Sequence, residues 1–359
     1  MALGDFICFS PTFITALENG FLVDVICTSK GFANLDYVVF EKEKNFDAIR
    51  FLSDFDKSAT YETVFLLDKK GIIPSINLLL KSKLKSLIPQ SIQKNRSFER
   101  LVFNFTIRPL FGVFGSVCSP IFSNDSVPVW KFLFDSFCKK FSISADFNLV
   151  VESLKSKLNS QLVSSSKITI PKEKFLVVHL FRDLDFKLLN SSSYLEIARF
   201  LKDNYSQYEI LLLCNLSNSA ETKQLSRFED NLRSLGLKFR ILPKLTFFDI
   251  IKIANSTPIY LGLDHGISHL FALFCKRSVL LYGSTKKRPH IDLLWPPLIT
   301  GEQIEVSPEI RSLKNSNSSC VIIHASSDDY LLSFDAPNYL LNKTITQINL
   351  KTAFDEVSK

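Results

Sequence analysis

Long apolar runs, paired cysteines and glycine-rich loops are missing from this chain of 359 residues, and each absence disfavours a class of protein. No apolar run reaches the roughly 18–20 residues that a helix needs to span a bilayer, so we expect no transmembrane segment. The seven cysteines form no CxxC pair, which disfavours a disulfide framework and a metal site and favours reduced thiols in a cytosol. No GxGxxG follows a predicted strand, which disfavours a dehydrogenase-type dinucleotide site.

A basic and apolar leader is also absent, because Met1 continues directly into ALGDF, and we expect no signal peptide. A strong charge of either sign is lacking too, since 43 Lys and Arg residues against 36 Asp and Glu residues give a net charge of +7. This mild excess suits an anionic substrate or an anionic membrane surface. It is too diffuse to indicate nucleic-acid binding.

The length of the chain exceeds that of one ordinary domain and predicts two domains of roughly 150–200 residues each. A hydrophobic fraction of 46% allows a large core. The polar stretch Asn159–Lys174, rich in Ser and Lys, is the best candidate for a linker. We therefore expect domains at residues 1–160 and 170–359.

Predicted strands alternate with predicted helices in both halves, which is typical of doubly wound parallel sheets. The strands expected in the first half are Phe21–Thr28, Val38–Phe40, Thr63–Leu67 and Leu101–Phe105, with helices at Thr12–Glu18, Phe46–Phe55 and Ser75–Leu87. The strands expected in the second half are Phe175–Phe181, Glu209–Cys214, Phe239–Leu242, Pro258–Leu263 and Ser278–Tyr282. The helices expected between them are Tyr194–Asn204, Glu221–Leu235, Phe247–Ala254 and His269–Phe274.

One predicted strand, Pro258–Leu263, ends in Asp264, His265 and Gly266, and a helix is expected to begin at once. Ligands of open α/β sheets bind at the carboxyl ends of the strands. The free N–H groups and the dipole of a helix start favour anionic groups such as phosphates. This arrangement predicts a site for a phosphorylated ligand.

The segment Leu242–Gly283 resembles the C-terminal signature of glycosyltransferase family nine, the ADP-heptose:lipopolysaccharide heptosyltransferases. It carries LPKL, a helix, a strand ending in D-x-G-x-x-H and a last strand ending in Y-G. Leu3-Gly4-Asp5 resembles the L-G-D opening of the family, and YETVFLLDKKGIIPS resembles a segment of its N-terminal domain. Several motifs in the right order over nearly the whole chain make this resemblance specific.

The resemblance implies a GT-B architecture, in which two Rossmann-like domains face each other across a cleft. The N-terminal domain would bind the acceptor and the C-terminal domain the nucleotide sugar. It implies inverting glycosyl transfer without a metal or cofactor, from a donor such as ADP-heptose to a phosphorylated glycolipid of the lipopolysaccharide core. Such a bacterial enzyme would be cytoplasmic, either free or peripheral on the inner face of the inner membrane, with no nucleic acid as a partner.

Residue by residue, the resemblance makes Asp5 the catalytic base and Lys187 a group that neutralises the diphosphate. Asp264 would accept hydrogen bonds from sugar hydroxyls, the N–H of Gly266 would face the diphosphate, and His269 would follow one helical turn later. Each residue also has a structural interpretation. Asp5 is a good helix cap, Lys187 suits a solvated loop, and His269 suits a half-buried helix face.

Three further donor-binding candidates follow from the same comparison. Glu221 stands where the family has a glutamate that would bind the ribose, and it equally suits the first turn of a helix. Leu245 falls where the family places an apolar residue beside the nucleotide base, and core packing is its alternative. His265 occupies the position where the family usually has Thr or Ser, so it adds bulk and a titratable group.

Four departures from the family pattern leave the donor and the activity open. The loop at residues 182–185 holds two acidic residues where the family has hydroxylated ones, and Leu189 replaces a tryptophan. His265 is the third departure. The first strand of the family precedes the G-D motif, and here that strand is expected to be missing. The alternatives are a relative with another donor or a protein acceptor, and a catalytically decayed relative kept as a binding or scaffold protein.

Overall fold

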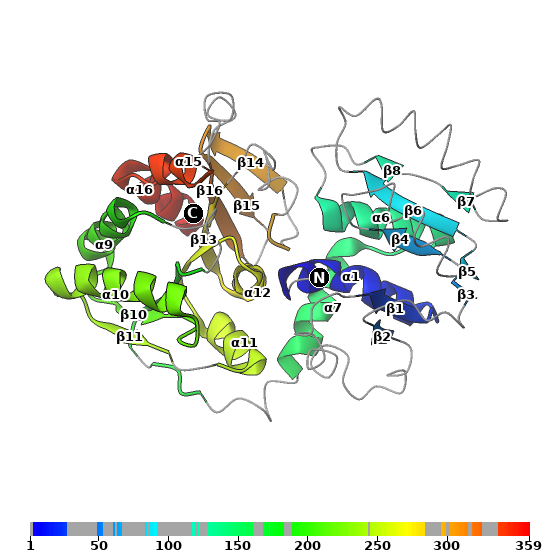
Figure 1. Ribbon diagram of the computed structural model, residues 1–359, viewed down its shortest axis with the longest axis horizontal. Coiled ribbons are helices and arrows are strands. Elements are labelled where there is room, and N and C mark those ends of the chain that lie inside the picture. Colours follow the sequence, from blue (N-terminus) through cyan, green and yellow to red (C-terminus); the bar gives the residue numbers. More distant parts are fainter. Residues whose placement is uncertain are drawn as a thin grey trace. The chain divides into compact units, whose positions relative to one another are not determined.

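The computed structural model falls into two compact units, one made of Met1 and Thr15–Ile143, the other of Ala2–Ile14 and Ser144–Lys359 (Figure 1). The residues described are 3–26, 49–52, 60–61, 63–66, 83–84, 86–91, 117–118, 121–122, 128–160, 168–171, 173–182, 189–242, 245–283, 296–298, 302–314, 318–324 and 337–359. Helix α1 (Leu3–Glu18) contributes to both units. Which unit binds an acceptor and which binds a nucleotide sugar stays a prediction.

The second unit is built on one sheet of eight strands in the order β11-β10-β9-β12-β13-β16-β15-β14. The strands are β9 (Phe175–His179), β10 (Glu209–Leu212), β11 (Phe239–Ile241), β12 (Tyr260–Leu263), β13 (Arg277–Tyr282), β14 (Glu302–Ser307), β15 (Ile310–Lys314) and β16 (Ser319–His324). From β11 to β16 all neighbours are parallel.

The edge formed by β14 and β15 corrects the expectation of an entirely parallel sheet, because both of its pairings are antiparallel. Only two residues separate β14 from β15, and four separate β15 from β16. A parallel crossover needs a dozen residues or more, so connections this short force the strands to reverse.

Helices cover both faces of this sheet. The helices of the second unit are α7 (Phe147–Ser160), α9 (Ser191–Tyr205), α10 (Ser219–Ser234), α11 (Phe247–Ser256), α12 (Gly266–Phe274), α15 (Pro337–Thr344) and α16 (Gln347–Ser358). Leu261 and Leu263 belong to the core cluster that α9, α10 and α16 complete. Tyr260 points to the other face, where its ring stacks on Phe271 of α12 with a centroid distance of 4.1 Å. Burial on both faces explains the continuous apolar runs of the central strands.

The chain order creates a switch point at the middle of the sheet. From β9 the chain proceeds outward through β10 to β11, and it then returns to β12 on the other side of β9 and continues to β13 and β16. The loops that leave β9 and β12 therefore diverge to opposite sides. A crevice at the carboxyl ends of two such strands is where doubly wound sheets bind nucleotides.

The first unit contains parallel pairs in the part of the chain that is described. Its elements are β1 (Val23–Ile26), β2 (Ile49–Leu52), β3 (Thr60–Tyr61), β4 (Val64–Leu66), β5 (Lys83–Leu84), β6 (Ser86–Ser91), β7 (Val117–Cys118), β8 (Ile121–Phe122) and α6 (Val129–Phe141). The pairs are β1 with β2, β3 with β5, and β6 with β4, β7 and β8.

Two helices expected in this unit are wrong. The range Phe46–Phe55 contains strand β2, which pairs with β1 from Val23 to Ile26, and Ser75–Leu87 overlaps β5 and the start of β6. Short apolar runs suit a helix and a buried strand equally, and here the pairing partner decides. The expected strands Val38–Phe40 and Leu101–Phe105 lie outside the described residues.

No helix in the described ranges has the length and apolarity that a membrane span requires.

Candidate functional site

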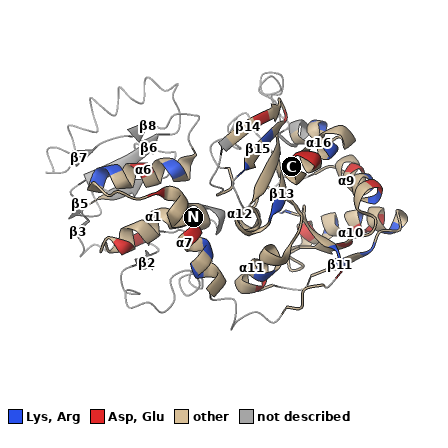
Figure 2. Cartoon of the chain, turned by 180° about the vertical axis from the view of Figure 1, so that it is seen from behind, with Lys and Arg blue, Asp and Glu red and all other residues tan. Residues whose placement is uncertain are grey.

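The candidate site lies at the switch point of the second unit, where β9 and β12 end side by side. Residues 180–182 follow β9, and Asp264 and His265 lead from β12 into α12. Helix α12 itself carries no Lys, Arg, Asp or Glu, so it is tan throughout in Figure 2. Any attraction of this helix for an anion comes from its backbone N-terminus and not from charged side chains on it.

The side chain of His265 caps the start of α12. His265 has extended backbone angles (φ −145°, ψ 156°), and its Nδ1 accepts a hydrogen bond from the N–H of Ile267 at 3.1 Å. The His265 carbonyl accepts from the N–H of Ser268 at 2.9 Å. The N–H of Gly266 has no hydrogen-bond partner among the described residues. Because the N–H groups of Ile267 and Ser268 already have partners, the predicted anion site at this helix start depends on the N–H of Gly266.

Asp264 is held by its backbone between two neighbouring elements. Its N–H donates to the carbonyl of Leu281 in β13 at 3.0 Å, and its carbonyl accepts from Nη1 of Arg182 in the loop after β9. The residue is 8% exposed. Asp264 is thus fixed to the loop that leaves β9.

His179, at the end of β9, was not among the predicted site residues. It is 4% exposed, its ring meets the ring of His265 edge-on at 4.7 Å, and burial lowers its pKa from 6.5 to about 3, with Arg182 acting in the same direction. His179 is therefore a neutral imidazole at physiological pH. A lone histidine that follows an apolar strand has no motif around it, so the sequence offered no signal.

Hydrogen bonds of side-chain hydroxyl groups link β12, α12 and β9 next to the turn Asp264–Gly266. The Ser268 hydroxyl donates to the carbonyl of Leu263 at 2.5 Å, which leaves its oxygen to accept from the phenol of Tyr260 at 2.8 Å. The Tyr260 oxygen lies 3.4 Å from Nδ1 of His179. Gly262 permits this arrangement, because a Cβ there would overlap the Tyr260 phenol. The close approach of ring and backbone explains why this strand has a glycine.

His269 lies in α12 one turn after the cap and is 6% exposed. Its Nδ1 is 3.4 Å from Sγ of Cys8 in α1, in the stretch Ala2–Ile14 that belongs to the second unit. The structure thus brings together four predicted residues on β12–α12: Asp264, His265, Gly266 and His269.

The remaining predicted residues stand apart from this turn or outside the described side chains. Glu221 is 7% exposed in the first turn of α10, where it accepts from the N–H of Asn215 at 3.0 Å, so its carboxylate shapes its own loop. Leu245 is half-buried and precedes Thr246, which forms a capping box with Asp249 at the start of α11. Asp5 lies in α1 but its side chain is not described, and Lys187 lies outside the described residues.

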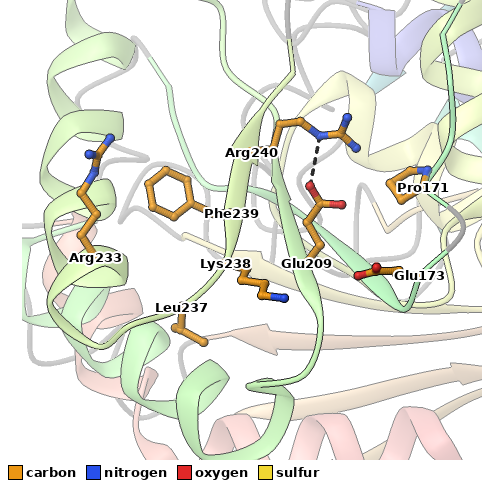
Figure 3. A pocket seen from close by; sticks show the side chains of 8 residues that line it. All are labelled: Pro171, Glu173, Glu209, Arg233, Leu237, Lys238, Phe239 and Arg240. Atoms are coloured by element: carbon orange, nitrogen blue, oxygen red, sulfur yellow. Dashed lines mark ion pairs between the residues drawn. The ribbon is translucent and has the colours of Figure 1, made fainter.

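A separate depression of about 780 Å³ opens at the other end of the sheet (Figure 3). Glu209 and Phe239, the first residues of β10 and β11, line it together with Arg233 and Arg240, and Arg240 pairs with Glu209 at 3.2 Å. Because the strands are parallel, their amino ends lie opposite the carboxyl ends that form the switch point. This depression is therefore not the candidate site.

Comparison with known proteins identifies the family. Residues 124–315, more than half of the chain, match the family model for glycosyltransferase family 9 (heptosyltransferase). The E. coli heptosyltransferase WaaC with ADP is 14% identical over 98% of this chain and 96% of that chain, with a TM-score of 0.57. WaaC with ADP-2-deoxy-2-fluoro heptose has the same identity and coverage, with a TM-score of 0.55.

The glycosyl transferase family 9 structure from Veillonella parvula DSM 2008 is 11% identical over 98% of this chain and 93% of that chain, with a TM-score of 0.50. No curated protein matches the sequence. Identities this low show a shared fold alone, and the family match adds the kind of reaction. The chain belongs to glycosyltransferase family 9, the heptosyltransferases, and is a glycosyltransferase with their GT-B fold.

Proposed function

We propose that this chain is an inverting, metal-independent glycosyltransferase that moves a heptose-like sugar from an ADP-sugar to a glycolipid of the lipopolysaccharide-core type. The observation that carries the proposal is the turn Asp264–Gly266 at the switch point, with the Gly266 N–H unpaired among the described residues. The similar WaaC structures, one with ADP and one with ADP-2-deoxy-2-fluoro heptose, support ADP as the nucleotide.

In this reaction an acceptor hydroxyl attacks the anomeric carbon of the donor sugar while the bond from that carbon to the diphosphate oxygen breaks. The hydroxyl proton passes to a base, for which we propose Asp5. The transition state has oxocarbenium character, as in glycoside hydrolysis. The electron pair of the broken bond stays with the nucleoside diphosphate, which leaves with increased negative charge.

The second unit supplies groups suited to that leaving charge. The N–H of Gly266 and the N-terminal dipole of α12 would face the diphosphate, and we propose that Lys187 adds a positive charge. We further propose that Asp264 and His269 contact the sugar, and that Glu221 and Leu245 contact the nucleoside. The ring of His265 would make the donor pocket narrower than the Thr or Ser usual in the family.

Calorimetric titration with ADP, UDP and GDP tests the donor. We expect selective binding of ADP, and titration with the ADP-sugar should show its affinity weakened at least tenfold in Asp264→Ala, equivalent to 1.4 kcal/mol. Asp230→Ala on the exposed face of α10 is the matched control and should leave binding unchanged. Binding of another nucleotide would indicate a family member with a different donor. A folded protein that binds none would support the binding or scaffold alternative.

Asp5→Asn tests the catalytic assignment. The amide cannot take the hydroxyl proton, so turnover with ADP-heptose and a core glycolipid should fall by about 10²–10⁴ while ADP affinity is kept. Unchanged turnover would remove Asp5 from the mechanism. Transfer to a protein and not to the glycolipid would change the acceptor and keep the reaction type.

A further inference from the structure

Gln224 of α10 makes an unusual pair of contacts with one residue across the switch point. It is 8% exposed, its Oε1 accepts from the backbone N–H of Arg182 at 3.1 Å, and its Nε2 donates to the backbone carbonyl of Arg182 at 2.5 Å. Both polar backbone groups of Arg182 are thus bound by one side-chain amide. Arg182 follows β9 by three residues and belongs to no strand or helix, so this amide replaces the pairing that a strand would give.

A second helix joins the same cluster. The phenol of Tyr194 in α9 lies 3.2 Å from Oε1 of Gln224 and 3.2 Å from the carbonyl of Leu180. Tyr194 is 1% exposed, and burial raises the pKa of its phenol far above the ordinary value, so the group is a neutral donor. Two helices therefore fix residues 180 and 182 of the loop that leaves β9.

Arg182 extends this restraint to the loop that leaves β12. Its Nη1 donates to the carbonyl of Asp264, which is the residue before His265 and the α12 turn. A continuous set of hydrogen bonds therefore runs from Gln224 through Arg182 to Asp264. It links the loop that leaves β9 to the loop that leaves β12, and the sequence separation of 82 residues leaves this link entirely to tertiary contacts.

We propose that Gln224 is a positioning residue for the nucleotide-sugar site, an inference that rests on the proposed function. It does not touch the donor. It holds Arg182, and Arg182 holds the Asp264 carbonyl, so that the N–H of Gly266 keeps the direction in which it meets the diphosphate.

The chemistry of the position favours glutamine over residues of similar size. A glutamine offers one acceptor and one donor at the same end, which match the N–H and the carbonyl of Arg182. Methionine has the same length and offers neither. An ionised glutamate keeps the acceptor but turns a second oxygen toward the Arg182 carbonyl, and a protonated glutamate regains a donor.

The test uses the full chain and compares Gln224→Met and Gln224→Glu with the wild type. We expect Gln224→Met to raise the Kd for ADP and the KM for the nucleotide sugar about tenfold, with a smaller change in kcat. Gln207→Met in the exposed turn before β10 is the matched control and should change neither constant. Amide hydrogen exchange at residues 264–268 should accelerate in Gln224→Met, although the substituted side chain lies in another helix.

The pH dependence of Gln224→Glu separates positioning from simple loss of stability. Each Kd is divided by the wild-type value at the same pH, which removes the pH dependence of the unchanged residues from the comparison. Burial and the facing Arg182 carbonyl should raise the pKa of the introduced carboxyl above its ordinary value. The ratio for Gln224→Glu should therefore fall toward one between pH 8 and pH 5 as this carboxyl takes a proton, and the ratio for Gln224→Met should stay constant.

If the Kd ratios of Gln224→Glu and Gln224→Met were the same at every pH, or if Gln224→Met bound ADP with wild-type affinity, Gln224 would not be a positioning residue. The proposed function would still stand. If the wild type itself binds no nucleotide, the proposed function fails and this inference fails with it. Should Gln224→Met not fold, Tyr194→Phe removes the contact to Oε1 and must raise the Kd in the same direction for the proposal to hold.

Discussion

At the scale of single residues, neighbours and not residue types decide what the histidines of this site can do. His179 is buried and neutral, His265 uses Nδ1 to cap a helix, and Nδ1 of His269 faces a thiol. Their common residue type predicts none of these states. The family motif located His265 and His269 in the sequence, but His179 acquires its role only when β9 and β12 lie side by side.

Titration of His179 should make the stability of the protein depend on pH. Its pKa is about 3 in the folded protein and near 6.5 in an unfolded chain, so between these values only the unfolded state binds the proton. The free energy of unfolding should therefore fall as the pH drops below 6.5, by up to ~1.4 kcal/mol per pH unit from this group.

Urea denaturation of the wild type and of His179→Gln at pH 7 and pH 5 measures this contribution. Glutamine keeps a polar group beside the Tyr260 phenol but does not titrate. The loss of stability between the two pH values should be smaller in the variant. An equal loss in both proteins would mean that His179 takes up its proton in the folded state as well.

At the scale of elements, the central strands of the second unit were predictable because each is a short apolar run between polar segments. The predicted range Pro258–Leu263 corresponds to β12, and the helix expected from His269 begins three residues earlier because the side chain of His265 caps it. In the first unit the same reasoning produced helices at β2 and β6. Apolar spacing alone does not separate the two structures over so few residues, and the pairing partners come from distant parts of the chain.

The contacts that shape the site were beyond sequence reasoning for a related reason. Gln224 meets Arg182 across 42 residues, and Tyr260 meets His179 across 81. Neither pair has a spacing that a local motif would record. The sequence could identify the candidate turn Asp264–Gly266, and only the fold identifies the residues that hold it.

Gly262 offers a test of how strictly β12 is packed. A methyl group in Gly262→Ala would displace the Tyr260 phenol from Ser268 and from its stack on Phe271. We expect the free energy of unfolding of the second unit to fall by about 2–4 kcal/mol, from overpacking and a lost buried hydrogen bond.

A double-mutant cycle with Tyr260→Leu checks that cause. With the aromatic ring removed, the added methyl group has room, and Gly262→Ala should then cost less than ~1 kcal/mol. The same cost in both backgrounds would place the conflict elsewhere on the strand.

At the scale of the whole molecule, the second unit is discontinuous in sequence. It takes residues 2–14 from the start of the chain and 144–359 from the rest, and α1 continues from it into the first unit. Each unit has buried aromatic residues of its own, such as Phe134 of α6 in the first and Phe228 of α10 in the second. Chains with two such cores depart from simple two-state unfolding.

Scanning calorimetry should therefore resolve two transitions, and the nucleotide should identify one of them. Phe228→Ala should lower the transition temperature of the second unit, and Phe134→Ala should lower that of the first unit. Each substitution should reduce the free energy of unfolding of its unit by about 3–5 kcal/mol. ADP binds only the folded site. At one hundred times its Kd it should add about 2.7 kcal/mol to the free energy of unfolding of the unit that Phe228→Ala destabilises. If ADP raised instead the transition that Phe134→Ala lowers, the donor site would belong to the first unit and the turn at Asp264 would not be its centre. A shift of both transitions by similar amounts would show that α1 couples the two cores.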